Sequence, residues 1–354
     1  MAHSGASPSA FREDADTALY WEASGNLSDG VWLVNGSQGL EDVGQPGAWE
    51  LLMASVYCVL CVLGLAANSL VICRLGRAAG ASTVAGVYVL NLAVADGLFM
   101  LGLPFLAAQL AARRWPFGAA LCRLVMLLDA LNQFAGVFCL TALSVDRYLA
   151  VARPLGSRRW RSPRLARGLG AGLWALALVP ALPVALYSGV VGSPGLCVLA
   201  WPEPVSAWSA AFILYSFVLG FLLPFTAISV CCGLLLLRLR ARARARAQAQ
   251  AAAASPESRL TTLVLSMVLA FALCWLPFYT INLCLVWLAR PPSPPVLRLF
   301  QLLVALSYSN SCANPLLYIG LSGRWPCRST GPGAPGTHTG TESLASGSAG
   351  GFGE

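Results

Sequence analysis

The chain has 354 residues, of which 57% are hydrophobic and only 11% are charged. Soluble globular domains are about 25% charged, so this composition argues against an ordinary soluble protein. The formal net charge of +8 comes with 23 basic residues, all of them arginine, and their positions decide whether they serve nucleic-acid binding or membrane topology.

Residues 1–48 are expected to form a disordered, acidic tail on the extracellular side. The first 50 residues contain eight acidic side chains. They lack the basic start and the apolar core of a cleavable signal peptide, so none is expected. Asn26 and Asn35 each begin an Asn-X-Ser triplet, which accepts N-glycosylation only on a lumenal segment. The tail is interpreted as a solubilising leader. The alternative is that its negative charge attracts a cationic ligand.

Seven apolar stretches follow the tail. A hydrocarbon core about 30 Å thick requires about 20 consecutive apolar residues in a helix, and helices satisfy their own backbone groups where no water is available. The sequence therefore predicts an all-α membrane protein, a seven-transmembrane helix bundle occupying residues 49–322. The spans are expected at 50–74, 83–110, 119–152, 165–187, 206–237, 260–289 and 297–320.

The arginines orient the bundle. If the amino terminus is extracellular, 17 of the 23 arginines fall on cytoplasmic segments, as the positive-inside rule requires. The alternating run Arg238–Arg246 is interpreted as the fifth helix leaving the bilayer among anionic headgroups, in preference to a nucleic-acid contact. We therefore expect a multi-pass plasma-membrane protein whose Gly/Ser/Thr-rich residues 323–354 form a largely disordered cytoplasmic tail.

Apart from Arg123 at the outer end of the third stretch, few charged side chains lie inside the second and third stretches: Asp96, Asp129 and the pair Asp146 and Arg147. Each such group costs about 2.5–3.5 kcal/mol on insertion scales, so intramembrane charges are usually functional. Asp129 and Arg147 are 18 residues apart, about 27 Å along a helix. One acid is thus expected near the outer surface and one charge pair near the cytoplasm.

Three motifs carry a family resemblance: Asp146-Arg147-Tyr148, Cys274-Trp275-Leu276-Pro277 and Asn314-Pro315-Leu316-Leu317-Tyr318. Each lies at the expected place in its own stretch, and together they resemble a rhodopsin-family (class A) G-protein-coupled receptor. A narrower resemblance to somatostatin receptors rests on several segments, namely 103–109, 115–118, 121–126, 129–134, 144–151, 201–204 and 308–315. Opioid and neuropeptide B/W receptors share parts of this pattern and are the alternatives.

The resemblance implies a peptide-binding pocket. Asp129 would pair with the lysine of the peptide's Trp-Lys turn, with help from Gln133. The remaining lining residues would be Gln109, Trp275, Phe278, Asn282, Phe300 and Tyr308. An Asp129 paired with another helix is the alternative for the anchor, and core packing is the alternative for Trp275 and Phe278.

The resemblance also implies an activation switch at the inner end. Arg147 would pair with Asp146 at rest and turn toward the terminal helix of the G protein on activation. The other residues of the switch would be Val137, Tyr148, Pro224, Phe271, Asn314, Pro315 and Tyr318. Position 232 is Cys where the family has Tyr, which leaves weak coupling as an alternative.

An allosteric sodium site is implied by the same resemblance and is the only cofactor expected. Its residues would be Asp96, Asn132, Asn310, Ser311 and Asn314. The chain departs from the group at Gly136, where a serine is usual, so one hydroxyl ligand is missing.

Two of the twelve cysteines, Cys122 and Cys197, face the oxidising side by topology and are expected to form a disulfide. Cys327, just past the seventh stretch, is a candidate for palmitoylation. The other nine are expected to act as small apolar membrane residues.

The sequence thus predicts a cell-surface receptor for a somatostatin-like cyclic peptide and not an enzyme. Its partners would be an inhibitory heterotrimeric G protein that lowers cAMP, membrane lipids and, through tail phosphorylation, arrestin, with no nucleic acid. The absence of lysine excludes an opsin, since retinal needs a Schiff-base lysine. A transporter or channel would need internal repeats or a continuous polar path, and neither is visible in the sequence.

Overall fold

The computed structural model describes residues 46–77, 83–153, 162–247, 256–288 and 292–321. The glycosylation triplets at Asn26 and Asn35, the palmitoylation candidate Cys327 and most of both predicted tails lie outside these ranges. The boundaries expected for the tails therefore stay predictions.

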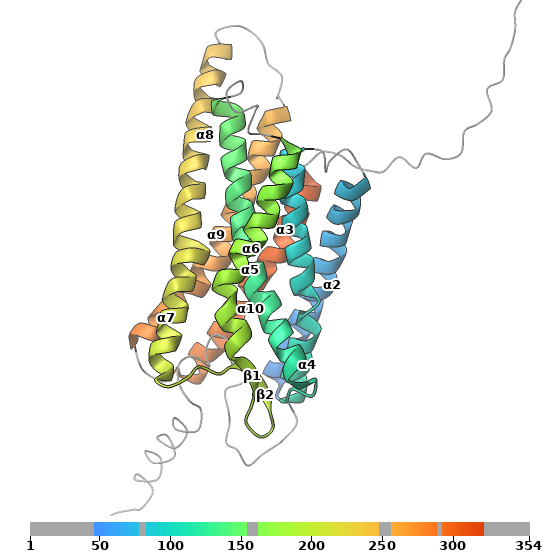
Figure 1. Cartoon of the computed structure of the whole chain (residues 1–354), viewed down its shortest axis with the longest axis vertical. Helices are drawn as coiled ribbons and strands as arrows, with labels where there is room; N and C mark the ends of the chain where they lie inside the picture. Colours follow the sequence, from blue (N-terminus) through green and yellow to red (C-terminus); the bar gives the residue numbers. More distant parts are fainter. Residues whose placement is uncertain (1–45, 78–82, 154–161, 248–255, 289–291, 322–354) are drawn as a thin grey trace, which may run out of the picture. The chain divides into compact units, whose positions relative to one another are not determined.

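Long helices make up nearly all of the described chain (Figure 1). They are α2 (Ala48–Arg77), α3 (Val84–Met100), α4 (Leu103–Ala112), α5 (Gly118–Ala152), α6 (Pro163–Tyr187), α7 (Val205–Phe217), the π-helix η3 (Val218–Leu222), α8 (Leu223–Ala247), α9 (Pro256–Leu288) and α10 (Pro294–Leu321). A hairpin of β1 (Ser188–Val191) and β2 (Leu196–Leu199) follows α6. The seven predicted stretches match these helices to within a few residues, except that α8 runs ten residues further.

Local sequence explains where two spans are interrupted. Between α3 and α4 the chain turns at Leu101 and Gly102, and Pro104 stands in the first turn of α4, where its missing N–H costs nothing. In the fifth span, η3 separates α7 from α8 directly before Pro224. The second and fifth spans are therefore each built from consecutive helical pieces.

Among the described residues, six spans are long and apolar enough to cross a membrane by composition alone. The seventh, α10, is long enough but carries a polar run that lowers its mean hydropathy: Ser307, Ser309, Asn310, Ser311 and Asn314. Four of these side chains line the cavity or the buried polar cluster described below, namely Ser307, Asn310, Ser311 and Asn314. The seventh span is therefore less apolar than expected because its inner face is polar.

The distribution of side chains is that of a protein in lipid. Large apolar residues face outward, such as Val62 on α2 and Val179 on α6, with 67% and 68% of their surface exposed. Polar residues such as Asn68, Asp96 and Asn314 are buried between the helices. So much outward apolar surface is incompatible with water and is satisfied by the hydrocarbon core.

Two apolar clusters fill the bundle. One surrounds the disulfide and the hairpin end and contains Phe134, Trp201 and Phe212. The other lies toward the opposite end and contains Phe221, Phe271 and Trp275. Buried polar groups lie within and between these clusters, and they form the sites described next.

Candidate functional site

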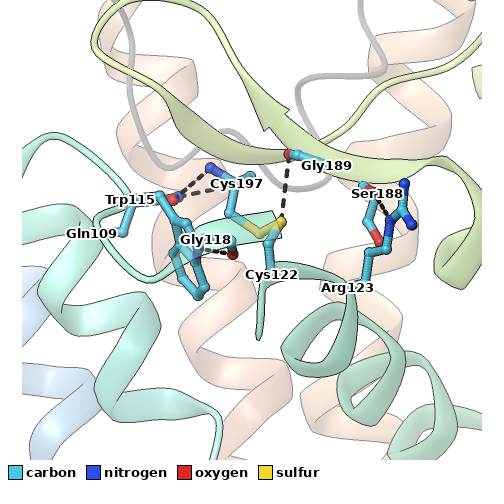
Figure 2. Close-up of a disulfide and its surroundings, with 8 residues drawn as sticks. All are labelled: Gln109, Trp115, Gly118, Cys122, Arg123, Ser188, Gly189 and Cys197. Atoms are coloured by element: carbon cyan, nitrogen blue, oxygen red, sulfur yellow. Dashed lines mark hydrogen bonds between the residues drawn. A yellow bond between two sulfur atoms is a disulfide. The ribbon is translucent and has the colours of Figure 1, made fainter. Parts of the chain in front are cut away.

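A disulfide between Cys122 and Cys197 ties the hairpin to the start of α5 (Figure 2). Cys197 stands on β2, opposite Val190 in the antiparallel register, and is 75 residues from its partner. The predicted pairing is therefore confirmed. It attaches the β1–β2 connection to the helix that carries Asp129.

Hydrogen bonds reinforce the disulfide on both sides of Cys197 (Figure 2). Gln109 Oε1 accepts from the Cys197 N–H at 2.8 Å, and Gln109 Nε2 donates to the Cys197 carbonyl at 3.4 Å. Arg123 Nε donates to the Ser188 carbonyl at 3.2 Å. The backbone N–H of Trp115 donates to the Gly195 carbonyl at 2.7 Å. Gln109, expected in the ligand pocket, uses its whole amide to hold the hairpin.

A cavity opens among α5, α7, α9 and α10. Six of the eight residues expected in a ligand pocket line it, namely Asp129, Gln133, Trp275, Phe278, Asn282 and Tyr308. Gln109 and Phe300 do not, although the Phe300 ring lies 6.4 Å from that of Phe278. The free volume is about 20 Å³, enough for one or two water molecules, so the cavity must widen to admit a larger group.

Sequence reasoning missed half of the lining: Phe212, Ile213, Ser216, Tyr279, Val304 and Ser307. Helical spacing was the available signal. Trp275, Phe278, Tyr279 and Asn282 follow the i, i+3, i+4, i+7 pattern of one helix face, so Tyr279 belongs with its predicted neighbours. The residues of α7 and α10 obey the same spacing, but their rotation toward the cavity is set by packing.

Asp129 is buried, with 5% of its surface exposed, and lines the cavity. Its Oδ2 accepts a hydrogen bond from the Tyr308 hydroxyl at 3.3 Å. Tyr308 is held in turn by ring contacts with Tyr57 and Phe99. Within the described ranges no arginine lies at ion-pair distance from Asp129. The carboxylate is thus oriented by a neighbouring helix without being neutralised by a cation.

Tyr279 joins three elements at the base of the cavity. Its hydroxyl accepts from Gln133 Nε2 on α5 and donates to the backbone carbonyl of Ser216 on α7 at 3.1 Å. Gly220 makes room for it, since a Cβ at that position would lie 2.7 Å from the hydroxyl oxygen. This network connects the residue beside Asp129 to the π-helix of the fifth span.

The polar residues expected to hold sodium are brought together deeper in the bundle. Asn314 Nδ2 donates to Asp96 Oδ2 at 3.2 Å, and Asn132 Nδ2 donates to Ser311 Oγ at 3.0 Å. The side-chain carbonyl oxygens of Asn132, Asn310 and Asn314 are buried and have no hydrogen-bond partner among the described residues. A carboxylate with unpartnered amide oxygens is a donor set that fits a hard monovalent cation.

The predicted switch residues extend from the middle of the bundle to the end of α5 that carries Arg147. Arg147 donates to Asp146 Oδ2, with Nε at 2.9 Å, which is the pairing expected at rest. Asn314 and Pro315 are buried, and Tyr148 is half-buried on α5. Val137, Phe271 and Cys232 belong to the apolar cluster that also contains Phe221 and Trp275, and Tyr318 packs against it. Pro224 is buried on α8. The switch residues thus come from α5, α8, α9 and α10.

The chain matches the 7 transmembrane receptor (rhodopsin family) over residues 67–318 and therefore belongs to that family. Within it the chain is 45% identical over 299 residues to somatostatin receptor type 5 of Bos taurus, covering 84% of this chain and 80% of that receptor. It is 48% identical over 276 residues to somatostatin receptor type 3 of Homo sapiens, which covers 78% of this chain and 66% of that receptor. It is 43% identical over 274 residues to somatostatin receptor type 2 of Mus musculus, which covers 77% of this chain and 74% of that receptor. It is thus a member that resembles the somatostatin receptors.

Family membership confirms several predictions. The chain is an all-helical, seven-transmembrane, multi-pass protein of the plasma membrane. The family consists of receptors and not of enzymes. The narrower expectations, on the ligand, the G protein and the role of each site residue, are developed as proposals below.

Proposed function

We propose that this protein is a cell-surface receptor for a somatostatin-like cyclic peptide and that it couples to inhibitory G proteins to lower cAMP. The observation that carries the proposal is Asp129, a buried carboxylate on a cavity wall with no cationic partner in the described ranges. The similarity to receptors named for somatostatin supports the peptide class.

A basic side chain of the ligand would supply the cation that Asp129 lacks. An ammonium and a carboxylate attract each other strongly in a low-dielectric cavity, provided both remain hydrogen-bonded. Trp275 and Phe278 meet edge to face with ring centroids 5.6 Å apart and offer a surface for an aromatic residue beside the ligand's lysine. A Trp-Lys pair at the tip of a tight turn fits this combination.

The direct test is a panel of somatostatin, cortistatin, opioid and neuropeptide W peptides applied to cells that express the chain. Binding and suppression of stimulated cAMP are measured together. Preference for somatostatin or cortistatin is expected. Preference for an opioid or neuropeptide W ligand would favour the alternative, a receptor for another neuropeptide.

Replacing Cys232 with Tyr is expected to raise peptide potency in cAMP suppression about tenfold. A tyrosine hydroxyl at this buried position of the inner cluster would stabilise the turned-out Arg147, and a hydrogen bond to a charged group contributes about 1.5–3 kcal/mol. The dose–response curve is measured beside binding, with Cys231→Tyr, one residue along α8, as the matched control. Equal potency in Cys232→Tyr and the natural chain would count against weak coupling.

Replacing Gly136 with Ser is expected to make peptide affinity about threefold to tenfold more sensitive to sodium, because the hydroxyl adds one ligand to the Asp96 cluster. The change fits sterically, since a Cβ there would lie 3.6 Å from Leu92 Cδ1, an ordinary contact. Binding is compared in sodium chloride and in N-methylglucamine chloride of equal ionic strength. Gly136→Ala adds the same Cβ without the hydroxyl and should behave like the natural chain; an equal response of Ala and Ser would refute a ligand role.

The proposal extends to modifications outside the described residues. Glycans at Asn26 and Asn35 would mark the extracellular tail, and a palmitate on Cys327 would anchor the start of residues 323–354 to the inner leaflet. Phosphorylated Ser and Thr of that tail would recruit arrestin.

A further inference from the structure

We propose that the Tyr279 hydroxyl is a latch that occupies Gln133 until ligand displaces it, and that its release frees the π-helix of the fifth span. This inference rests on the proposed function, because it gives the ligand at Asp129 a physical route to α7. Tyr279 is a positioning residue in this role: it acts through Gln133 and Ser216.

Both hydrogen-bonding functions of the Tyr279 hydroxyl are used within the bundle. The hydroxyl accepts from Gln133 Nε2 and donates to the Ser216 carbonyl. Tyr279 has 2% of its surface exposed, and its ring contacts those of Phe217 and Phe221. A hydroxyl held this firmly between α5 and α7 couples any movement of one helix to the other.

The acceptor on α7 lies where the backbone pattern changes. Ser216 stands two residues before η3, whose i→i+5 hydrogen bonds interrupt the α-helical register. Gly220 lies inside η3, and a Cβ added to it would come within 2.7 Å of the Tyr279 oxygen, so a larger residue there would exclude the hydroxyl. The fifth span therefore carries both the acceptor and the space that the latch requires.

The ligand anchor and the latch share one face of α5. Asp129 and Gln133 are spaced i, i+4, so a cation held by Asp129 lies beside the Gln133 amide. The cavity has only about 20 Å³ free, and the Tyr279 side chain forms part of its wall. Gln133 uses its Nε2 to donate to Tyr279, whereas a ligand ammonium can only donate and must bond Gln133 Oε1. In so small a cavity the ammonium would reach that oxygen by turning the amide, which breaks the Nε2 bond to Tyr279. Tyr279 then ceases to bridge α5 to the carbonyl of Ser216, on the segment that leads into Pro224.

Removal of the hydroxyl should favour the ligand. In Tyr279→Phe the ligand no longer has to break the hydrogen bond between Gln133 and Tyr279. Peptide affinity is therefore expected to rise about threefold to tenfold, the range for one net hydrogen bond. Gly220→Ala, which pushes the hydroxyl away without removing it, should raise affinity in the same direction. In the double variant, Gly220→Ala should add nothing, because the oxygen that it repels is gone.

Tyr215→Phe is the matched control. It also removes a tyrosine hydroxyl that bridges α7 to a neighbouring helix, in this case to the Pro180 carbonyl of α6 at 2.9 Å, and Tyr215 does not line the cavity. Its peptide affinity should stay that of the natural chain. A rise in Tyr215→Phe equal to that in Tyr279→Phe would assign the effect to general loosening of α7 and overturn the latch.

A second measurement is made without ligand, so its outcome tests the latch whether or not the proposed function is correct. Thermal unfolding of the purified receptor without peptide is followed for Tyr279→Phe, Gln133→Met and the double variant. Each single change should lower the Tm by about 2–4 °C, and the double should lower it by no more than the larger single effect. Additive shifts, or a loss of peptide affinity in Tyr279→Phe, would overturn the latch. Failure of every peptide in the panel would overturn the proposed function and leave the unfolding result to decide on the latch.

Discussion

Asp129→Asn is expected to abolish binding of a somatostatin-type peptide, with affinity falling at least about 100-fold, while the receptor still reaches the cell surface. Breaking a buried ion pair by removing one partner costs about 3–5 kcal/mol, because the other charge is left uncompensated. Asparagine has nearly the same shape, and its carbonyl can still accept from the Tyr308 hydroxyl, so the helices should pack as before. Radioligand saturation binding and surface labelling of an amino-terminal tag measure the two quantities.

A modified ligand makes this test specific for the charge pair. A peptide whose lysine is replaced by norleucine should bind the natural chain as poorly as the unmodified peptide binds Asp129→Asn. Both changes together should cost little more than either alone, since they remove the same interaction. Additive losses would place the lysine elsewhere, and unchanged affinity in Asp129→Asn would remove the anchor role altogether.

Loss of the Cys122–Cys197 bond is expected to have the second largest effect. Cys197→Ser should lower peptide affinity about 10-fold to 100-fold and reduce the amount of receptor at the surface, because loss of a native disulfide typically costs about 2–5 kcal/mol. The hairpin would then be held to α4 and α5 by hydrogen bonds alone, chiefly those of Gln109 and Arg123. Binding and surface labelling are compared before and after mild reduction of intact cells.

The double variant Cys122→Ser with Cys197→Ser controls for an unpaired thiol. It should behave like either single variant, and reduction should have no further effect on it. If the double variant bound peptide as well as the natural chain, the hydrogen bonds would suffice to hold the hairpin. Adding Gln109→Leu to the double variant should then loosen the hairpin further.

Much of the fold could be predicted because the properties that decide it are local. Bilayer thickness converts directly into the length of an apolar helix, and arginine placement selects the orientation. The pairing of Cys122 with Cys197 followed from topology alone, since they were the two cysteines expected on the oxidising side. Asp129 and Gln133 were expected together from the resemblance to somatostatin receptors, and both line the cavity because i, i+4 residues of a helix share a face.

The hydrogen-bond partners of Gln109 and Tyr279 could not be predicted in this way. Gln109 binds the backbone of Cys197, 88 residues away, and Tyr279 reaches Ser216, 63 residues away on another helix. On sequence grounds alone, the Gln109 amide and the Tyr279 hydroxyl could equally have been left to bond a ligand. The π-helix η3 could not be predicted from the sequence either, because a one-residue shift in hydrogen-bond register leaves the apolar composition unchanged.

Composition, spacing and short motifs were therefore enough to predict the number of membrane crossings, the disulfide and the family of receptor, because these follow from the content of individual segments and their order along the chain. The polar contacts between helices became known only from the packed bundle: the contact of Asp129 with Tyr308, the Asp96 cluster and the Tyr279 network. Helices in lipid expose apolar surface on every outer side, so their rotation depends on how buried polar groups and small residues fit together across the bundle.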